Sequence, residues 1–190
     1  IAAPTSEAAS GYTTGPLNAN ALGEELFPET RVDLAATLEG RHRWQPRDCA
    51  DGTVHPLEAG DSTATYFYRT LVAKSEGTLQ LRLGSDDGLA LWFNGQKLLS
   101  RDVPRGVAPD QDAVKVTVRA GTNTVLLRIY NRGGDCGFYF NTDQSLKGVA
   151  DALAARFPRE PACVAKYVRV EAWLAASGST RCEEEASRSL

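Results

Sequence analysis

Two adjacent carboxylates, Asp86 and Asp87, are the side chains whose type and spacing most directly suggest chemistry in this sequence. Gly88 follows them, and alternating apolar segments lie on both sides. Aspartate side chains accept hydrogen bonds from nearby backbone amides, and Gly tolerates the backbone angles of tight turns. The simplest interpretation of the Asp-Asp-Gly run is therefore a turn between two strands.

Signatures of catalysis are missing from the sequence. A Ser/His/Asp set could be assembled from His42 or His55, but no GxSxG elbow is present. Gly133-Gly134 lacks the Gly-Lys-Ser/Thr ending and the following helix of a phosphate loop. Glycoside hydrolysis needs two carboxylates at a fixed separation, and 24 acidic residues nominate no particular pair. We therefore predict that the chain is not an enzyme, although it could be the accessory domain of one.

The four cysteines, Cys49, Cys136, Cys163 and Cys182, fit no metal or redox motif. None lies in CxxC or CxxCH spacing, and the two histidines leave few ligands for a transition metal. An even number of cysteines fits two disulfides in an exported protein, whether periplasmic, cell-surface or extracellular. Four buried thiols in a cytosolic protein are the alternative. Among the three pairings we favour Cys49–Cys136 with Cys163–Cys182, since the second closes a short loop.

Composition and charge are those of an ordinary globular protein. Apolar residues make up 42% and charged residues 24% of the 190 residues, which excludes wholesale disorder, collagen and a long coiled coil. The formal charge is −3 and there is no basic run, so nucleic-acid binding lacks its main source of affinity. No apolar stretch approaches the roughly 18 residues of a membrane span. Because Met is absent, either a leader has been removed or the chain is a segment of a longer protein.

Alternating apolar residues predict six strands in succession. The segments are 63–72, 79–83, 89–93, 114–118, 125–129 and 138–140. Asn94-Gly95 predicts a hairpin turn, because both residues tolerate positive φ. Turns rather than helices join the strands, which indicates an antiparallel β-sandwich and not a βαβ sheet. We expect a mainly β protein with a jelly-roll sandwich.

The ends of the chain follow other patterns. We expect an irregular N-terminal segment over residues 1–29, with a short helix near 20–26, and the sandwich over 30–142. Residues 143–190 have apolar residues at helical spacing and predict a helical C-terminal extension. Pro158 ends its first helix, and a second helix begins near Pro161. Apolar contacts of this second helix would be Val164, Val168 and Trp173.

Several of these motifs resemble those of PA14-like and galactose-binding-like β-sandwich modules. The resemblance is carried by GSDDGLALWFNG (84–95), AGTNTVLLRI (120–129) and GGDCGFYF (133–140), with WQP (44–46), DGTVH (51–55) and ATYFYRT (64–70) upstream. Residues 30–142 look like the jelly-roll domain embedded in large exported planctomycete proteins. Such modules accompany enzymes without supplying their catalytic groups, so the resemblance implies a fold more than a function.

The resemblance also implies a metal site at the Asp-Asp corner. In PA14-like lectins two adjacent aspartates and a later Asn bind Ca²⁺, which then holds sugar hydroxyls. Matched by position, these ligands are Asp86, Asp87 and Asn131. Carboxylates are suitable, because Ca²⁺ takes about six to eight hard oxygen ligands. Arg132 would bring a cation close to the ion. No cofactor other than Ca²⁺ is expected.

Trp92 and Trp44 are candidates for contact with a sugar. Trp92 alternates with Leu91 and Phe93, so it points to the opposite face of its sheet. Burial under another layer is the expected outcome for so large a ring. An exposed ring could instead stack on the apolar face of a sugar. The same two interpretations apply to Trp44.

Two functions from different classes follow from these observations. The leading hypothesis is a non-catalytic module that binds a glycan, with or without Ca²⁺, through Asp86, Asp87, Asn131, Trp92 and Trp44. The alternative is a structural or assembly domain that docks onto a partner protein or neighbouring domains through its helical extension. That extension has no place in a lectin module, which is why the second hypothesis stays open.

Overall fold

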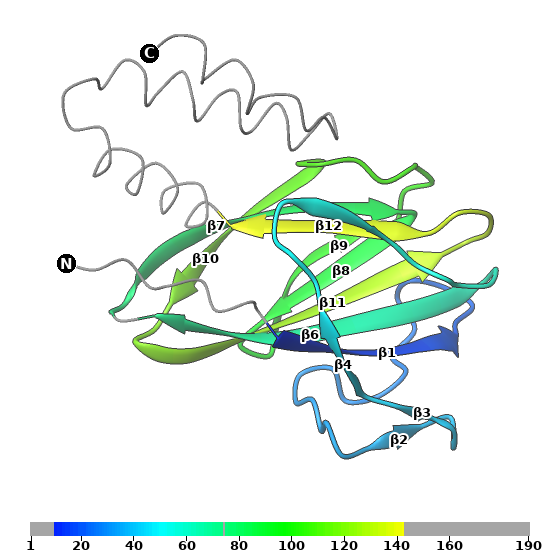
Figure 1. Ribbon diagram of the computed structural model, residues 1–190, viewed down its shortest axis with the longest axis horizontal. Coiled ribbons are helices and arrows are strands. Elements are labelled where there is room, and N and C mark those ends of the chain that lie inside the picture. Colours follow the sequence, from blue (N-terminus) through cyan, green and yellow to red (C-terminus); the bar gives the residue numbers. More distant parts are fainter. Residues whose placement is uncertain (1–9, 74, 143–190) are drawn as a thin grey trace, which may run out of the picture. The chain divides into compact units, whose positions relative to one another are not determined.

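The computed structural model describes residues 10–73 and 75–142, and its regular elements there are all β-strands (Figure 1). The strands are β1 Ser10–Asn18, β2 Thr37–Leu38, β3 His42–Arg43, β4 Gln45–Asp48, β5 Thr53–Pro56, β6 Thr63–Ala73, β7 Gly77–Asp86, β8 Gly88–Phe93, β9 Gln96–Arg101, β10 Asp112–Val118, β11 Gly121–Asn131 and β12 Gly137–Thr142. The predicted mainly β class is confirmed. The predicted helices of 143–190 lie outside the described residues. Within the described part, no helix is long and apolar enough to cross a membrane.

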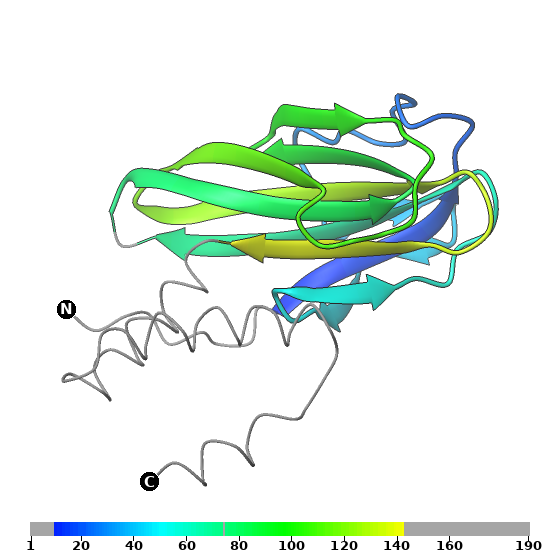
Figure 2. The ribbon, with the colours of Figure 1, turned by 90° about the horizontal axis from the view of Figure 1, so that it is seen from above.

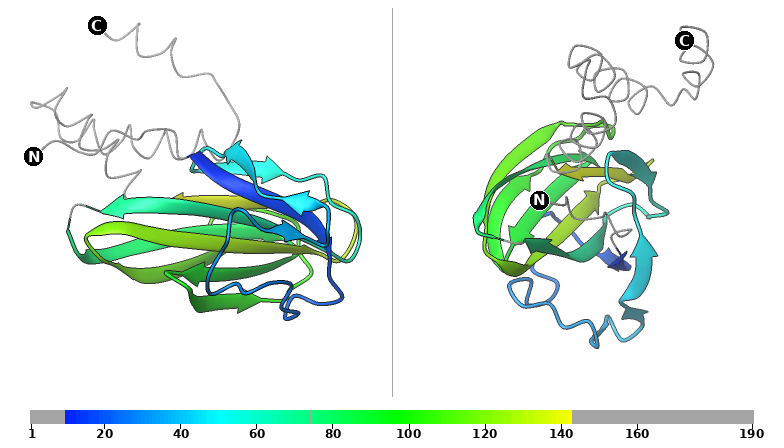
Figure 3. Two further views of the ribbon diagram at one scale, coloured as in Figure 1. Left: turned by 90° about the horizontal axis from the view of Figure 1, so that it is seen from below. Right: turned by 60° about the vertical axis from the view of Figure 1, so that its left-hand side comes forward.

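Ten strands form two antiparallel sheets. The six-stranded sheet has the order β4-β1-β6-β11-β8-β9, the four-stranded sheet has the order β10-β7-β12-β5, and β2 pairs with β3 in a separate hairpin. Figures 2 and 3 show the strands of the two sheets running side by side in two layers. All six predicted strand segments are strands of these sheets. The antiparallel sandwich predicted from their alternation is therefore confirmed.

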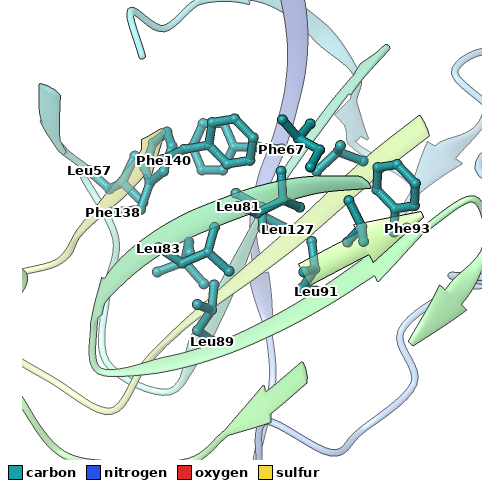
Figure 4. Packing of buried hydrophobic residues seen from close by; sticks show 14 of the residues in the cluster. Leu57, Phe67, Leu81, Leu83, Leu89, Leu91, Phe93, Leu127, Phe138 and Phe140 are labelled. Carbon is teal, nitrogen blue, oxygen red and sulfur yellow. The ribbon is translucent and has the colours of Figure 1, made fainter. Parts of the chain in front are cut away.

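An apolar core fills the space between the two sheets. Leu81 and Leu83 of β7 lie in it with Leu89 and Leu91 of β8, and all four are fully buried (Figure 4). Each is two residues from the next apolar position of its strand, so the period-two pattern places all of them on one face. The core also takes Phe67 from β6, Leu127 from β11, and Phe138 and Phe140 from β12. We call this set the inner core.

A second apolar cluster covers the opposite face of the six-stranded sheet. It contains Leu17, Leu22, Trp44, Tyr66, Trp92, Leu126 and Tyr130, with Phe27, Val32 and Leu34 packed against it. The segment between β1 and β4 supplies the covering residues, so this face is closed by irregular chain and the short β2-β3 hairpin. We call this set the outer cluster.

The N-terminal segment differs from the sequence-based expectation. Residues 1–29 were expected to be irregular, but β1 is a strand of the six-stranded sheet between β4 and β6. The predicted helix near 20–26 is also wrong, because the chain there forms turns. The guanidinium of Arg128 donates hydrogen bonds to the carbonyls of Leu22 and Glu24. Those carbonyls are thereby taken by a side chain rather than by the amides of a following helical turn.

The predicted hairpin turn at Asn94-Gly95 is confirmed. It joins β8 to β9, and both residues have positive φ, 50° and 78°. Gly95 is required for a second reason, since a Cβ atom there would lie 2.5 Å from the carbonyl oxygen of Thr30. The turn therefore touches the covering segment of the outer cluster.

Candidate functional site

Asp86 and Asp87 lie where the chain passes from one sheet to the other. Asp86 is the last residue of β7 in the four-stranded sheet, and Gly88 is the first residue of β8 in the six-stranded sheet. The peptide bond between the two aspartates is cis. The predicted turn is thus a single-residue crossing between sheets rather than a hairpin within one sheet. We call this region the Asp-Asp corner.

The Asp87 carboxylate connects three segments of the chain. One oxygen accepts a hydrogen bond from the backbone amide of Arg105 at 3.2 Å, and the other accepts one from the amide of Arg132 at 2.9 Å. The amide of Asp87 in turn donates to the carbonyl of Tyr130 at 3.2 Å. The side chain is buried and each oxygen keeps a further lone pair. Asp87 therefore fixes the geometry of the corner and can still bind one more partner.

Asp86 is only half-buried, and its electrostatic surroundings are unfavourable for a negative charge. Partial burial raises the pKa of this carboxyl, and the carboxylates of Asp87 and Asp135 raise it further. A hydrogen bond from the amide of Val107 acts in the opposite direction. The net effect is a raised pKa, so the ionised form of Asp86 is disfavoured at this corner. A bound cation would reverse that preference.

Asn131 lies in sequence between Tyr130 and Arg132, whose backbone groups are hydrogen-bonded to Asp87. Its side chain is fully buried, its Nδ2 donates to the carbonyl of Gly60 at 3.1 Å, and its Oδ1 accepts from the amide of Gly133 at 3.2 Å. These bonds hold the turn after β11 in place. A second lone pair on Oδ1 is left after the bond from Gly133.

The two arginines at the corner are each paired with another carboxylate. Arg132 donates to Asp102 at 2.5 Å, and Arg105 donates to Asp112 at 2.5 Å and to the hydroxyl of Ser85 at 3.1 Å. The positive charge of Arg132 is thus offset by Asp102. Arg132 would therefore not bring an unbalanced positive charge close to a metal ion at this corner.

The donors at the corner fit Ca²⁺ in type but not as a complete cage. Asp86, Asp87 and Asn131 supply carboxylate and amide oxygens, which are the hard ligands that Ca²⁺ prefers. Among the residues that the structure describes, however, no three His, Cys, Asp or Glu side chains gather closely enough to form a metal site. Any Ca²⁺ at this corner would need backbone oxygens, water or ligand hydroxyls to complete its coordination.

Trp92 and Trp44 are not sugar-stacking platforms. Trp92 is 2% exposed and Trp44 is 7% exposed, and both belong to the outer cluster. Trp92 does point away from the face that carries Leu91 and Phe93, as the alternation predicted. The covering segment buries that second face. The rings of Phe27 and Trp44 meet edge-on, with their centres 5.9 Å apart. Burial, the expected outcome for so large a ring, is confirmed.

The predicted Cys49–Cys136 disulfide is not formed in the structure. Both residues are free thiols. The Cys136 sulfur points to the carbonyl of Asp86 at 3.5 Å, and burial together with the carboxylates of Asp86 and Asp87 raises the pKa of this thiol to about 11. Burial also raises the pKa of the Cys49 thiol. Cys163 and Cys182 lie outside the described residues, so their pairing stays a prediction.

Two residues of the corner, Arg105 and Asp135, were not found from the sequence. Arg105 binds both the Ser85 carbonyl and hydroxyl, and it lies 20 positions away along the chain. Asp135 contributes a carboxylate that acts on Asp86, although it lies within the GGDCGFYF motif that carries the family resemblance. That motif was the one signal that could have indicated Asp135. Nothing in the pattern around Arg105 pointed to the corner.

Comparisons with known proteins identify no family for the chain. No family model matches it, and no curated protein matches it. Solved structures similar to it include the PA14 domain of the MpAFP antifreeze protein (22% identity, 44% of this chain and 45% of that one, TM-score 0.34). Another is a family 35 carbohydrate-binding module from an environmental isolate (15% identity, 45% of this chain and 72% of that one, TM-score 0.34). A third is an anti-sigma factor domain-containing protein (13% identity, 70% of this chain and 41% of that one, TM-score 0.43). The chain matches less than half the length of the first and third of these structures.

Proposed function

We propose that the chain is a non-catalytic binding module that recognises a glycan at the Asp-Asp corner, with Ca²⁺ as the bridging ion. The observation that carries this proposal is the pair of adjacent carboxylates between β7 and β8, of which Asp87 is held by the amides of Arg105 and Arg132. A cation would also relieve the repulsion between Asp86 and the carboxylates of Asp87 and Asp135. The motif resemblance to PA14-like lectins supports the choice of ligand class.

Each residue of the corner has a separate part in this proposal. Asp86, Asp87 and Asn131 would hold the ion, which when bound would supply a Lewis-acid centre for sugar hydroxyls. Asp87 keeps the corner rigid, because its two oxygens accept the amides of Arg105 and Arg132. A rigid corner favours binding, since less ordering of the protein is needed when the ligand arrives.

The first test measures stability without any glycan. The pKa of Asp86 is higher in the folded state than in the unfolded state. The free energy of unfolding therefore falls as the pH rises from the usual carboxyl pKa to the raised pKa, because the folded state must then give up a proton that it holds more tightly. Asp86→Asn should therefore raise the melting temperature at neutral pH when Ca²⁺ is absent. Added Ca²⁺ should stabilise the wild type and leave Asp86→Asn unchanged.

The second test is a glycan array read with and without a chelator. The wild type should bind in Ca²⁺ and lose binding in chelator, and Asp86→Asn should not bind in either condition. Asp48→Asn, an exposed aspartate of β4, is the matched control and should bind as the wild type does. Binding that survives both the chelator and Asp86→Asn would contradict the role of the ion. Absence of binding to any glycan would contradict the function itself.

A role as an assembly domain stays the second prediction. Its basis is the predicted helical extension of residues 143–190, which lies outside the described residues. Stable co-purification with a partner, lost when this extension is deleted while the sandwich stays folded, would support that role.

A further inference from the structure

A second cleft lies on the outer face of the six-stranded sheet, at the end of β8 remote from the Asp-Asp corner. Its volume is about 230 Å³. Its walls are the covering segment at Thr30–Val32 and the hairpin turn Asn94-Gly95. Small-molecule sites are concave and typically enclose roughly 300–1,000 Å³, so this cleft lies just below that range and has room for a small ligand only.

One row of paired residues forms the floor of this cleft. Tyr68 of β6 pairs with Leu126 of β11, which pairs with Trp92 of β8, and all three line the cleft. Neighbours across antiparallel strands direct their side chains to the same face of the sheet. Tyr68 is only half-buried, and burial raises the pKa of its hydroxyl, so this group stays protonated and can donate a hydrogen bond. The floor thus offers an aromatic body with a polar tip.

The rim of the cleft is positively charged. Arg31 and Arg119 both line it, and both are exposed. Within the described residues neither guanidinium forms an ion pair, and Arg119 makes only a 3.4 Å bond to the carbonyl of Thr122. Lys97 does not line the cleft; its Nζ lies 4.6 Å from the centre of the Trp92 ring, and its charge acts on Glu29.

The carboxylate that lines the cleft does not offset these charges. Glu29 is 4% exposed, accepts a hydrogen bond from the Tyr66 hydroxyl at 2.6 Å, and lies 3.1 Å from the guanidinium of Arg128. Its charge is therefore balanced from inside the molecule. The cleft is left with two guanidinium groups whose fork of N–H donors matches a carboxylate.

We propose that this cleft binds a small sugar acid, with its carboxylate between Arg31 and Arg119. The ring of Tyr68 meets the apolar face of the sugar, since Tyr combines an apolar body with a polar end. Thr30 and Thr124 also line the cleft, and their hydroxyls can bond to the sugar hydroxyls. The site is independent of the Asp-Asp corner and needs no metal ion.

The test is an NMR titration of the ¹⁵N-labelled full chain with D-glucuronate, in chelator and at low salt. Binding should shift the amide signals of residues 30–32, 94–95 and 124. The double variant Arg31→Gln/Arg119→Gln should bind about tenfold more weakly, because the two exposed guanidinium–carboxylate contacts together contribute on the order of 1.4 kcal/mol, the equivalent of tenfold. Arg41→Gln, which removes an arginine outside the cleft, is the matched control and should bind as the wild type does.

Three further ligands test whether both the carboxylate and the sugar hydroxyls are needed for binding, and one variant tests which site binds. D-glucose should bind about tenfold more weakly than D-glucuronate, because it has no carboxylate. Acetate and benzoate should also bind more weakly, because they have no sugar hydroxyls. Equal binding of any of these ligands, or unchanged binding by the double variant, would overturn the proposal. Asp86→Asn should leave glucuronate binding intact, and its loss would assign the binding to the Asp-Asp corner instead.

Discussion

The two faces of the six-stranded sheet are packed by different means. The inner core consists of leucine and phenylalanine side chains, and the guanidinium groups of Arg47 and Arg69 lie over the rings of Phe67 and Phe140. The outer cluster surrounds Arg128, which is fully buried and whose Nε donates to the Tyr66 hydroxyl at 2.8 Å. The same guanidinium faces Glu29 and donates to two carbonyls of the covering segment. One sheet therefore has a side filled mainly by apolar side chains and a side organised by a fully buried ion pair.

The difference shows how irregular chain is held against a sheet. Apolar contact is non-directional, so it stabilises the two facing sheets without defining where a loop must lie. Hydrogen bonds from a guanidinium are directional, and they fix the carbonyls of Leu22 and Glu24 at defined positions. The covering segment thus depends on Arg128, and the walls of the second cleft depend on the covering segment.

Arg128→Met should have the largest effect and would break the outer cluster. Without the guanidinium, the buried Glu29 carboxylate loses its cation, and the free energy of unfolding should fall by about 4 kcal/mol at neutral pH. Burial already raises the pKa of Glu29, so the variant should regain stability as the pH falls and the carboxyl is protonated. Urea denaturation at several pH values measures both effects. The added change Glu29→Gln should restore part of the loss, and a loss below about 1 kcal/mol would contradict the proposed dependence.

Leu91→Ala should have the next largest effect, on the inner core. Leu91 is fully buried between the sheets, and removing a buried leucine side chain typically costs about 3 kcal/mol through lost transfer energy and the cavity left behind. No titratable group is involved, so this loss should be the same at acidic and neutral pH. Urea denaturation measures it, with Leu98→Ala on the exposed β9 as a control expected within about 0.5 kcal/mol of wild type. A loss that varied with pH would contradict the contrast between the two faces.

Tyr66→Phe should have the smallest effect and would sharpen the comparison within the outer cluster. The hydroxyl donates to Glu29 and accepts from Arg128, so its removal leaves two buried charged groups each short of one bond. We expect a loss of about 1–2 kcal/mol by thermal or urea unfolding. Tyr12→Phe, at a partly exposed ring, should leave stability unchanged. A neutral result for Tyr66→Phe would show that the ion pair alone holds the cluster.

The inner core could be predicted from sequence because its residues repeat at the period of a strand. Leu89, Leu91 and Phe93 alternate along β8, and the alternation alone places them on one face. Arg128 obeys the same pattern, between Leu127 and Ile129, which assigns it to the opposite face. An arginine on such a face would normally be exposed. Its complete burial depends on contacts with residues more than 100 positions away, which local periodicity cannot contain.

The candidate site likewise has features that the sequence predicts and features that depend on the folded chain. The Asp-Asp-Gly run predicted a turn, and the order of strands on both sides indicated where it lies. The partners of Asp87 are amides of Arg105 and Arg132, supplied by segments far apart in sequence. Burial of Trp92 is expected from the size of its ring, but the segment that covers it is irregular chain, which the strand pattern does not identify.

The sequence by itself determined six of the ten strands of the two sheets, their inward faces, the Asn94-Gly95 turn and the place of the Asp-Asp corner. These are consequences of side-chain period and backbone preference over a few residues. The tertiary structure alone decided that β1 belongs to the sheet, that Arg128 and Glu29 are buried together, and that a cationic cleft remains beside them. The physical reason is that burial of a charge depends on the partners that meet it in space, and those partners are brought together only when the chain is folded.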